Sequence, residues 1–136
     1  MKYIFIAHSH TIFLTSCGVI HDRRLPHEDV IFLFTRNYRT SLPLDGCREV
    51  YADEEFARFY SLKNFPSRAV LHSAIRDLDR MVEDWTGGSS FEVFVPHLWS
   101  PFFKLLQTHR LCRRASFVQE GAFTVRKYFH NDPSIW

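Results

Sequence analysis

The feature that most constrains the fold is a series of short, strongly apolar segments that alternate with helix-like segments. Residues 2–7 and 29–35 are rich in β-branched and aromatic side chains, and the second run is apolar almost without a break. Such runs are typical of strands buried on both faces, as in a parallel sheet. Strands that alternate with helices need crossover connections, so the pattern predicts an α/β fold.

Further segments complete this pattern. The expected strands cover residues 2–7, 29–35, 48–52, 91–95 and 115–119, and the expected helices lie between most of them. Ser9 or Thr11 is expected to cap the first helix, and Ser67 to cap a helix over residues 67–85 that ends at Gly87. Together these segments predict a Rossmann-like three-layer sandwich with a mostly parallel five-stranded sheet, formed as one domain by residues 1–136.

Charge and length exclude several classes of protein. The net charge is +2 with both signs interspersed, whereas nucleic-acid-binding domains usually carry a clustered basic face, so no nucleic-acid partner is expected. No apolar run reaches the roughly 18 residues of a membrane-spanning helix. The three scattered cysteines indicate buried, reduced thiols in a cytoplasmic protein. The alternative is a lipoprotein cleavage box at residues 14–17, although polar residues 8–10 interrupt its apolar core.

Nucleotide and nucleophile motifs are absent from the sequence. The turn after the first strand lacks the glycine pattern of dinucleotide sites, and neither a P-loop nor a nucleophile elbow occurs. Gly87 and Gly88 precede a strand, so they lie at the wrong edge of the sheet to hold a phosphate. No cofactor is therefore expected.

Polar residues follow several of the expected strands. In an open parallel sheet, ligands bind beyond the carboxyl ends of the strands where the strand order reverses, here expected between the first and fourth strands. Glu120 is the main candidate, because partial burial at such an end raises a carboxyl pKa toward that of a general base. Gly121 lets the chain turn and a ligand approach. The alternative role of Glu120 is a helix cap or an ion pair with Arg114 or Arg126.

Histidines form a second candidate group. His8, His10 and His97 flank expected strand ends, and with Glu120 they could supply metal ligands for a small hydrolase. They could also contact an anionic or sugar ligand, or have only a structural role beside Ser9. A basic cluster is expected to be a solvated face, with contact to an acidic glycan or an anionic membrane surface as the alternative; its members are Lys104, Arg110, Arg113, Arg114, Arg126 and Lys127.

The opening strand, the His/Ser/Thr-rich turn after it, and residues 117–121 (FVQEG) together suggest a family. They resemble the amino-terminal half of bacterial GT-B sialyltransferases, the lipooligosaccharide sialyltransferases and capsular polysialyltransferases. The resemblance implies that Glu120 is the general base and Gly121 the glycine of an acidic-acidic-glycine motif, in which Gln119 replaces the first acid. The family's His-Pro motif has no counterpart, because Pro96 and His97 stand in the reverse order.

The same resemblance implies a function in surface polysaccharide synthesis. A CMP-activated sugar of the sialic acid type would be transferred with inversion to a glycan acceptor, without a metal or cofactor. His8, Ser9, His10 and His97 would line the acceptor cleft. A GT-B enzyme closes two domains over its donor, so this chain would be half of such an enzyme and inactive without a donor-binding domain. A cytoplasmic location, peripheral at the inner membrane, fits that role.

Phenylalanine is unusually abundant, with 14 residues in the chain. The last expected apolar residues, Phe129, Ile135 and Trp136, have no evident packing partner. An exposed aromatic patch near the carboxyl terminus is therefore expected, in contact with a second domain or another copy of the chain. The remaining alternative is a binding module without catalytic activity.

Overall fold

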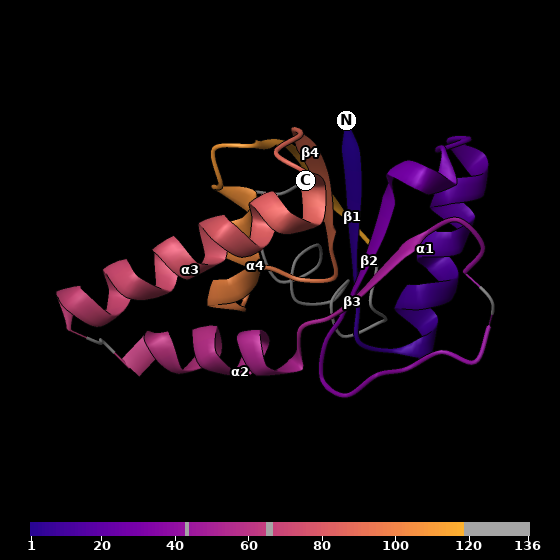
Figure 1. Ribbon diagram of the computed structural model, residues 1–136. Coiled ribbons are helices and arrows are strands. Elements are labelled where there is room, and N and C mark those ends of the chain that lie inside the picture. The colour runs from indigo at the N-terminus through magenta and orange to yellow at the C-terminus, as the bar shows by residue number, and fades with distance from the viewer. Residues whose placement is uncertain (43, 65–66, 119–136) are drawn as a thin grey trace, which may run out of the picture.

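The computed structural model describes residues 1–42, 44–64 and 67–118. Figure 1 shows the arrangement of the elements in this part of the chain. The strands are β1 (Lys2–Ala7), β2 (Val30–Phe34), β3 (Arg48–Tyr51), β4 (Phe91–Val95) and β5 (Cys112–Phe117). The α-helices are α1 (His10–Asp22), α2 (Asp53–Ser61), α3 (Arg68–Thr86) and α4 (Pro101–Gln107), with short 3-10 turns η1 (His27–Asp29) and η2 (Leu62–Asn64).

The strands form one parallel sheet in the order β3-β2-β1-β4-β5. Ile4 in the central strand pairs with Ile31 of β2 on one side and with Val93 of β4 on the other. Every residue of β2 and β4 is buried, which agrees with the unbroken apolar sequence of β2 and includes the charged Glu92 in β4. The expected α/β, Rossmann-like fold with a five-stranded parallel sheet is confirmed.

Two apolar cores cover the two faces of the sheet. Figure 1 shows α1 on one side of the sheet and α2, α3 and α4 on the other. Phe5 and Phe32 face α1, whereas Ile4 and Ile31 face the other three helices. Side chains alternate between faces along a strand, so each central strand contributes to both cores. The result is a three-layer arrangement.

Phenylalanine fills much of both cores. Nine of the 14 phenylalanines are at most 2% exposed: Phe5, Phe13, Phe32, Phe34, Phe59, Phe91, Phe94, Phe102 and Phe103. Core packing therefore accounts for most of the phenylalanine excess. The expected carboxyl-terminal patch of Phe129, Ile135 and Trp136 lies outside the described residues.

The helix ends follow the expected signals. The Ser67 hydroxyl accepts a hydrogen bond from the Val70 backbone N–H at 3.3 Å, and α3 ends at Gly87 in the left-handed conformation, with φ of 64°. Gly87 adopts this conformation without a Cβ penalty, so it terminates the helix. Ser9 caps α1 by accepting from the Ile12 N–H at 3.3 Å.

The fifth strand begins earlier than expected. Residues 115–119 were expected to form it, but β5 runs from Cys112 to Phe117 and includes Arg113 and Arg114. Among the described residues β5 is an edge strand that pairs with β4 alone, and an edge position tolerates charged side chains. The expected strand was based on apolar residues alone, so it left out Arg113 and Arg114, which an edge strand can contain.

The three cysteines are free thiols, as expected, but they are half-buried rather than buried. None of the helices in the described ranges is long and apolar enough to cross a membrane.

Candidate functional site

The strand order reverses between β1 and β4. The chain leaves β1 through α1 toward β2, and leaves β4 through α4 toward β5, on the opposite face of the sheet. The carboxyl ends of these two strands are where an open α/β sheet usually binds ligands. His8 follows β1 directly, and His97 lies two residues after β4.

The structure brings His8 and His97 together at this edge. Their ring centroids are 5.7 Å apart, with the ring planes inclined by 45°. His97 is 5% exposed and packs against the ring of Phe103 in α4 at 4.9 Å. The approach depends on the β1–β4 pairing, because 88 positions separate the two residues in the sequence.

Trp99 orients His97. The two rings stack with centroids 4.8 Å apart, and the Trp99 backbone N–H donates to His97 Nδ1 at 3.3 Å. A nitrogen that accepts carries no proton, so the neutral His97 ring holds its proton on Nε2. No role for Trp99 was predicted from the sequence. The available signal was its position two residues after His97, just beyond the end of a strand.

The amino terminus of α1 points to the same edge. The Ser9 hydroxyl accepts from the Ile12 N–H and the Ser9 carbonyl accepts from the Phe13 N–H at 3.0 Å. No acidic residue occupies the first turn of α1. The partial positive charge of this helix end is therefore not offset by a neighbouring carboxylate in that turn.

His10 has a different neighbour from the other two histidines. It is exposed on the first turn of α1, and its Nδ1 lies 3.4 Å from the hydroxyl of Tyr38 in the connection after β2. The described part of the chain contains no group of three or more histidine, cysteine or acidic side chains arranged to hold a metal ion. The metal-hydrolase interpretation also needs Glu120, which lies outside the described residues together with Gly121.

Two buried hydroxyls follow strand ends at the same edge. Thr35 comes directly after β2, and its N–H donates to the Ala7 carbonyl at 3.2 Å. Ser100 precedes α4, and its side chain makes no capping hydrogen bond there. Within residues 1–42, 44–64 and 67–118, Thr35 Oγ1 and Ser100 Oγ have no hydrogen-bond partner. Buried polar groups are normally satisfied, so these two hydroxyls are exceptions within the described part of the chain.

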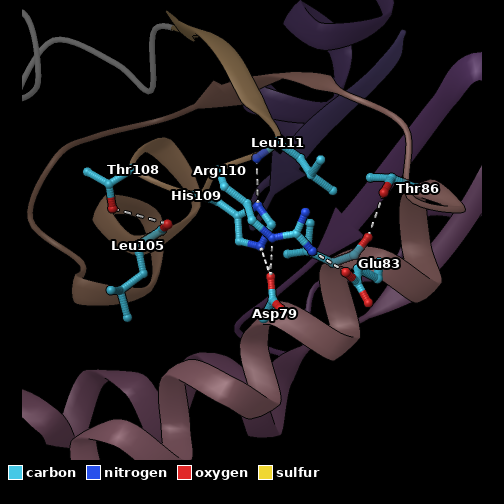
Figure 2. Close-up of polar contacts among 9 residues, drawn as sticks. Asp79, Glu83, Thr86, Leu105, Thr108, His109, Arg110 and Leu111 are labelled. Carbon is cyan, nitrogen blue, oxygen red and sulfur yellow. Dashed lines mark hydrogen bonds and ion pairs between the residues drawn. The ribbon is translucent and has the colours of Figure 1, made fainter.

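A second polar cluster lies at the opposite edge of the sheet (Figure 2). Asp79 of α3 accepts from His109 Nε2 at 2.9 Å and from Arg110 Nε at 3.2 Å, in the turn between α4 and β5. Arg110 also pairs with Glu83. Burial raises the pKa of Asp79, but the hydrogen bonds from His109 and Arg110 outweigh it, so the net shift is downward. The sequence reasoning missed this cluster, since its partners lie 30 residues apart.

The basic cluster expected as a solvated face is partly engaged. Arg110 binds Asp79 and Glu83, and Arg114 lies 3.6 Å from Glu92. Arg113 and Lys104 are exposed. Arg126 and Lys127 lie outside the described residues.

The fold and the paired histidines define the class of this protein as an α/β, Rossmann-like domain with a candidate ligand site at the carboxyl edge of its sheet. Comparisons with protein-family models, curated proteins and solved structures found no match.

Proposed function

We propose that this domain is the acceptor-binding half of an inverting glycosyltransferase that transfers a CMP-activated sugar of the sialic acid type to a glycan. The observation that carries the proposal is the approach of His8 to His97, 5.7 Å between ring centroids, where the strand order reverses. The two imidazoles lie together, and the His97 ring stacks on the flat apolar ring of Trp99. This combination suits a sugar, which presents hydroxyls around an apolar face.

The first turn of α1 supports an anionic ligand. The partial positive charge at this helix end, with no acidic residue in the first turn, favours a carboxylate or phosphate. A sialylated glycan or a sugar nucleotide carries such a group.

In the proposed reaction Glu120 is the general base. The acceptor hydroxyl oxygen attacks the anomeric carbon of the donor sugar and forms the new glycosidic bond. The bond from that carbon to the CMP phosphate oxygen breaks, and CMP leaves with the electron pair. The hydroxyl proton passes to the carboxylate of Glu120, and the direct displacement inverts the anomeric configuration.

Donor binding is assigned in this proposal to a second, nucleotide-binding domain. The present chain is then expected to bind an acceptor without turning over a donor. The test follows from this separation. Titration of the isotope-labelled chain with lactose, oligosialic acid and CMP, followed by NMR, should give saturable shifts for a glycan around His8, His97 and Trp99.

Two substitutions sharpen the test. His97→Gln should weaken glycan binding several-fold, whereas His72→Gln on the exposed surface of α3 should not, and circular dichroism should show both variants folded. Glu120→Gln should leave acceptor binding intact and abolish transfer when a donor-binding domain is supplied. Glycan shifts far from the carboxyl edge, or equal binding by both histidine variants, would overturn the proposal.

A further inference from the structure

A groove of about 530 Å³ separates the outer side of α3 from the turn that joins α4 to β5. Its floor is apolar and is made by Ile75 and Leu78 of α3 with Leu105 of α4. The floor lies beside the Asp79–His109–Arg110 cluster, which Figure 2 shows joining α3 to the turn. This groove is at the amino edge of the sheet, so it is separate from the edge that carries His8 and His97.

The apolar floor continues along α3 beyond the groove. Ile75 is 42% exposed, and Leu71, one turn earlier on the helix, is also exposed. Residues three and four apart lie on the same face of a helix, so Leu71, Ile75 and Leu78 form a stripe about 10 Å long, in which Leu71 and Ile75 are exposed and Leu78 is buried. Exposed apolar side chains in a continuous stripe, rather than singly, mark interaction sites.

Positive charge surrounds this stripe. Arg76 and Arg80 of α3 and Arg110 of the turn line the groove. Arg68, two turns before Ile75, and Lys104, one turn before Thr108 in α4, extend the same flank.

These cations outnumber the acidic side chains near them. Arg110 is already held by Asp79 and Glu83, and Arg80 lies 3.8 Å from Asp77. Within the described ranges, Arg76 makes no hydrogen bond or ion pair. Its guanidinium is therefore open to a partner carboxylate.

We propose that this groove binds an acidic, amphipathic segment of a partner protein. Apolar side chains of the partner would occupy the floor at Leu71, Ile75 and Leu105, and its carboxylates would meet Arg76 and Arg80. Apolar anchors spaced three and four residues apart on a helix match a stripe of this length. The Asp79–His109–Arg110 cluster fixes the turn between α4 and β5 before binding, which lowers the entropic cost of ordering the site.

The structure favours this occupant over two others. A second copy docked groove to groove would set one positive surface against another, because a two-fold interface pairs each patch with itself. A flat anionic membrane surface does not enter a concave groove, so it would not reach the apolar floor.

The test uses two synthetic helical peptides and the full chain. Both peptides carry Leu at positions i, i+3, i+4 and i+7, and the other positions are Glu in one peptide and Lys in the other. Fluorescence anisotropy should show saturable binding of the Glu peptide that weakens as salt rises, and no saturable binding of the Lys peptide. Arg76→Glu and Ile75→Ser should each weaken binding several-fold.

Matched variants on other surfaces serve as controls. Arg113→Glu on the edge strand and Leu14→Ser on α1 alter exposed residues away from the groove, and they should bind the Glu peptide as the unmodified chain does. Equal binding of the two peptides, or unchanged binding by Arg76→Glu and Ile75→Ser, would overturn the proposal. So would binding to phosphatidylglycerol vesicles without peptide binding, or a dimer in sedimentation that Ile75→Ser dissociates.

Discussion

Glu92 of β4 is 1% exposed and meets the Arg23 guanidinium, just beyond α1, through two hydrogen bonds of 3.1 Å each. Ser116 of β5 donates a third hydrogen bond to Glu92 at 2.6 Å. The carboxylate therefore ties the end of α1 to the two strands at one side of the sheet. A buried carboxylate that loses its partners is strongly destabilising, so this cluster stabilises the layer formed by α1.

The Glu92 cluster should make the free energy of unfolding decrease as the pH falls. Burial raises the pKa of Glu92, but the hydrogen bonds from Arg23 and Ser116 and the nearby positive charges outweigh it, so the pKa falls below its ordinary value of 4.5. A lowered pKa contributes stability above the unfolded-state pKa, and this contribution is lost as pH falls through the folded-state pKa. Urea unfolding of Glu92→Gln should show a smaller loss of stability below about pH 4.5 than the unmodified chain.

At neutral pH the same variant should be less stable by about 1–3 kcal/mol, because Gln replaces a carboxylate that accepts charge-assisted hydrogen bonds. Glu54→Gln, at an exposed position of α2, provides the control and should change neither the stability nor its acid dependence. An unaltered acid dependence in Glu92→Gln would show that folding does not lower the pKa of Glu92.

Asp79 should stabilise the turn between α4 and β5. Its carboxylate accepts a hydrogen bond from His109 Nε2 at 2.9 Å. The Nδ1 atom of the same ring accepts a hydrogen bond from the Leu111 N–H at 3.1 Å. Asp79→Ala removes the acceptor of two hydrogen bonds and should lower the free energy of unfolding by about 1–3 kcal/mol. Hydrogen exchange at Leu111 should accelerate in this variant.

Asp84→Ala on the same helix is a matched control for Asp79→Ala. Asp84 pairs with Arg48 at the surface, where its side chain is 74% exposed, and exposed pairs contribute little, roughly 0–1 kcal/mol. An equal effect of the two substitutions on Leu111 exchange would contradict a local role for Asp79.

The stacked pair Phe5 and Phe94 should be a major source of stability on the α1 face. The rings are parallel within 5° and their centroids are 4.1 Å apart. Phe94→Ala opens a cavity and should cost about 3–5 kcal/mol in the free energy of unfolding, measured with urea. Leu14→Ala, at an exposed position of α1, should cost less than about 1 kcal/mol; similar costs for both would show that the Phe94 side chain is not in the core.

The thiols should react slowly with iodoacetamide. Burial raises the pKa of Cys17 and of Cys47 above 9.0, and both line a cavity of about 280 Å³. The thiolate is the reactive form, so a raised pKa lowers the alkylation rate at neutral pH. Mass spectrometry over a pH series should place the rise in rate at higher pH than for a cysteine peptide; a rise at lower pH would contradict the burial of these thiols.

Helices and strands were predictable where neighbouring side chains in the sequence specify them. β1 and β4 have the bounds expected from their apolar sequences, and Ser67 caps α3 through its own hydroxyl and the Val70 N–H. These features depend on side chains within a few residues of one another. β5 departs from expectation because its length follows from pairing with β4 at the edge of the sheet.

The candidate site was predictable only in part. The carboxyl ends of the strands pointed to His8 and His97, and their approach agrees with the expected strand order. His10 carries the same chemistry but lies beside Tyr38 instead. Spacing along the chain therefore did not decide which imidazoles meet, because His10 lies on the first turn of α1 whereas His8 precedes that helix.

By itself, the sequence determined the class of fold, the bounds of β1 and β4, the caps of α1 and α3, and the burial of β2 on both faces. Apolar patterns and capping residues act over a few positions, so they can be recognised without knowing the partners. Only the tertiary structure decided that Arg23 meets Glu92, that His8 meets His97, and that a basic groove opens beside Ile75. Each of these depends on which strands and helices pack together, and that choice is made by the cores as a whole.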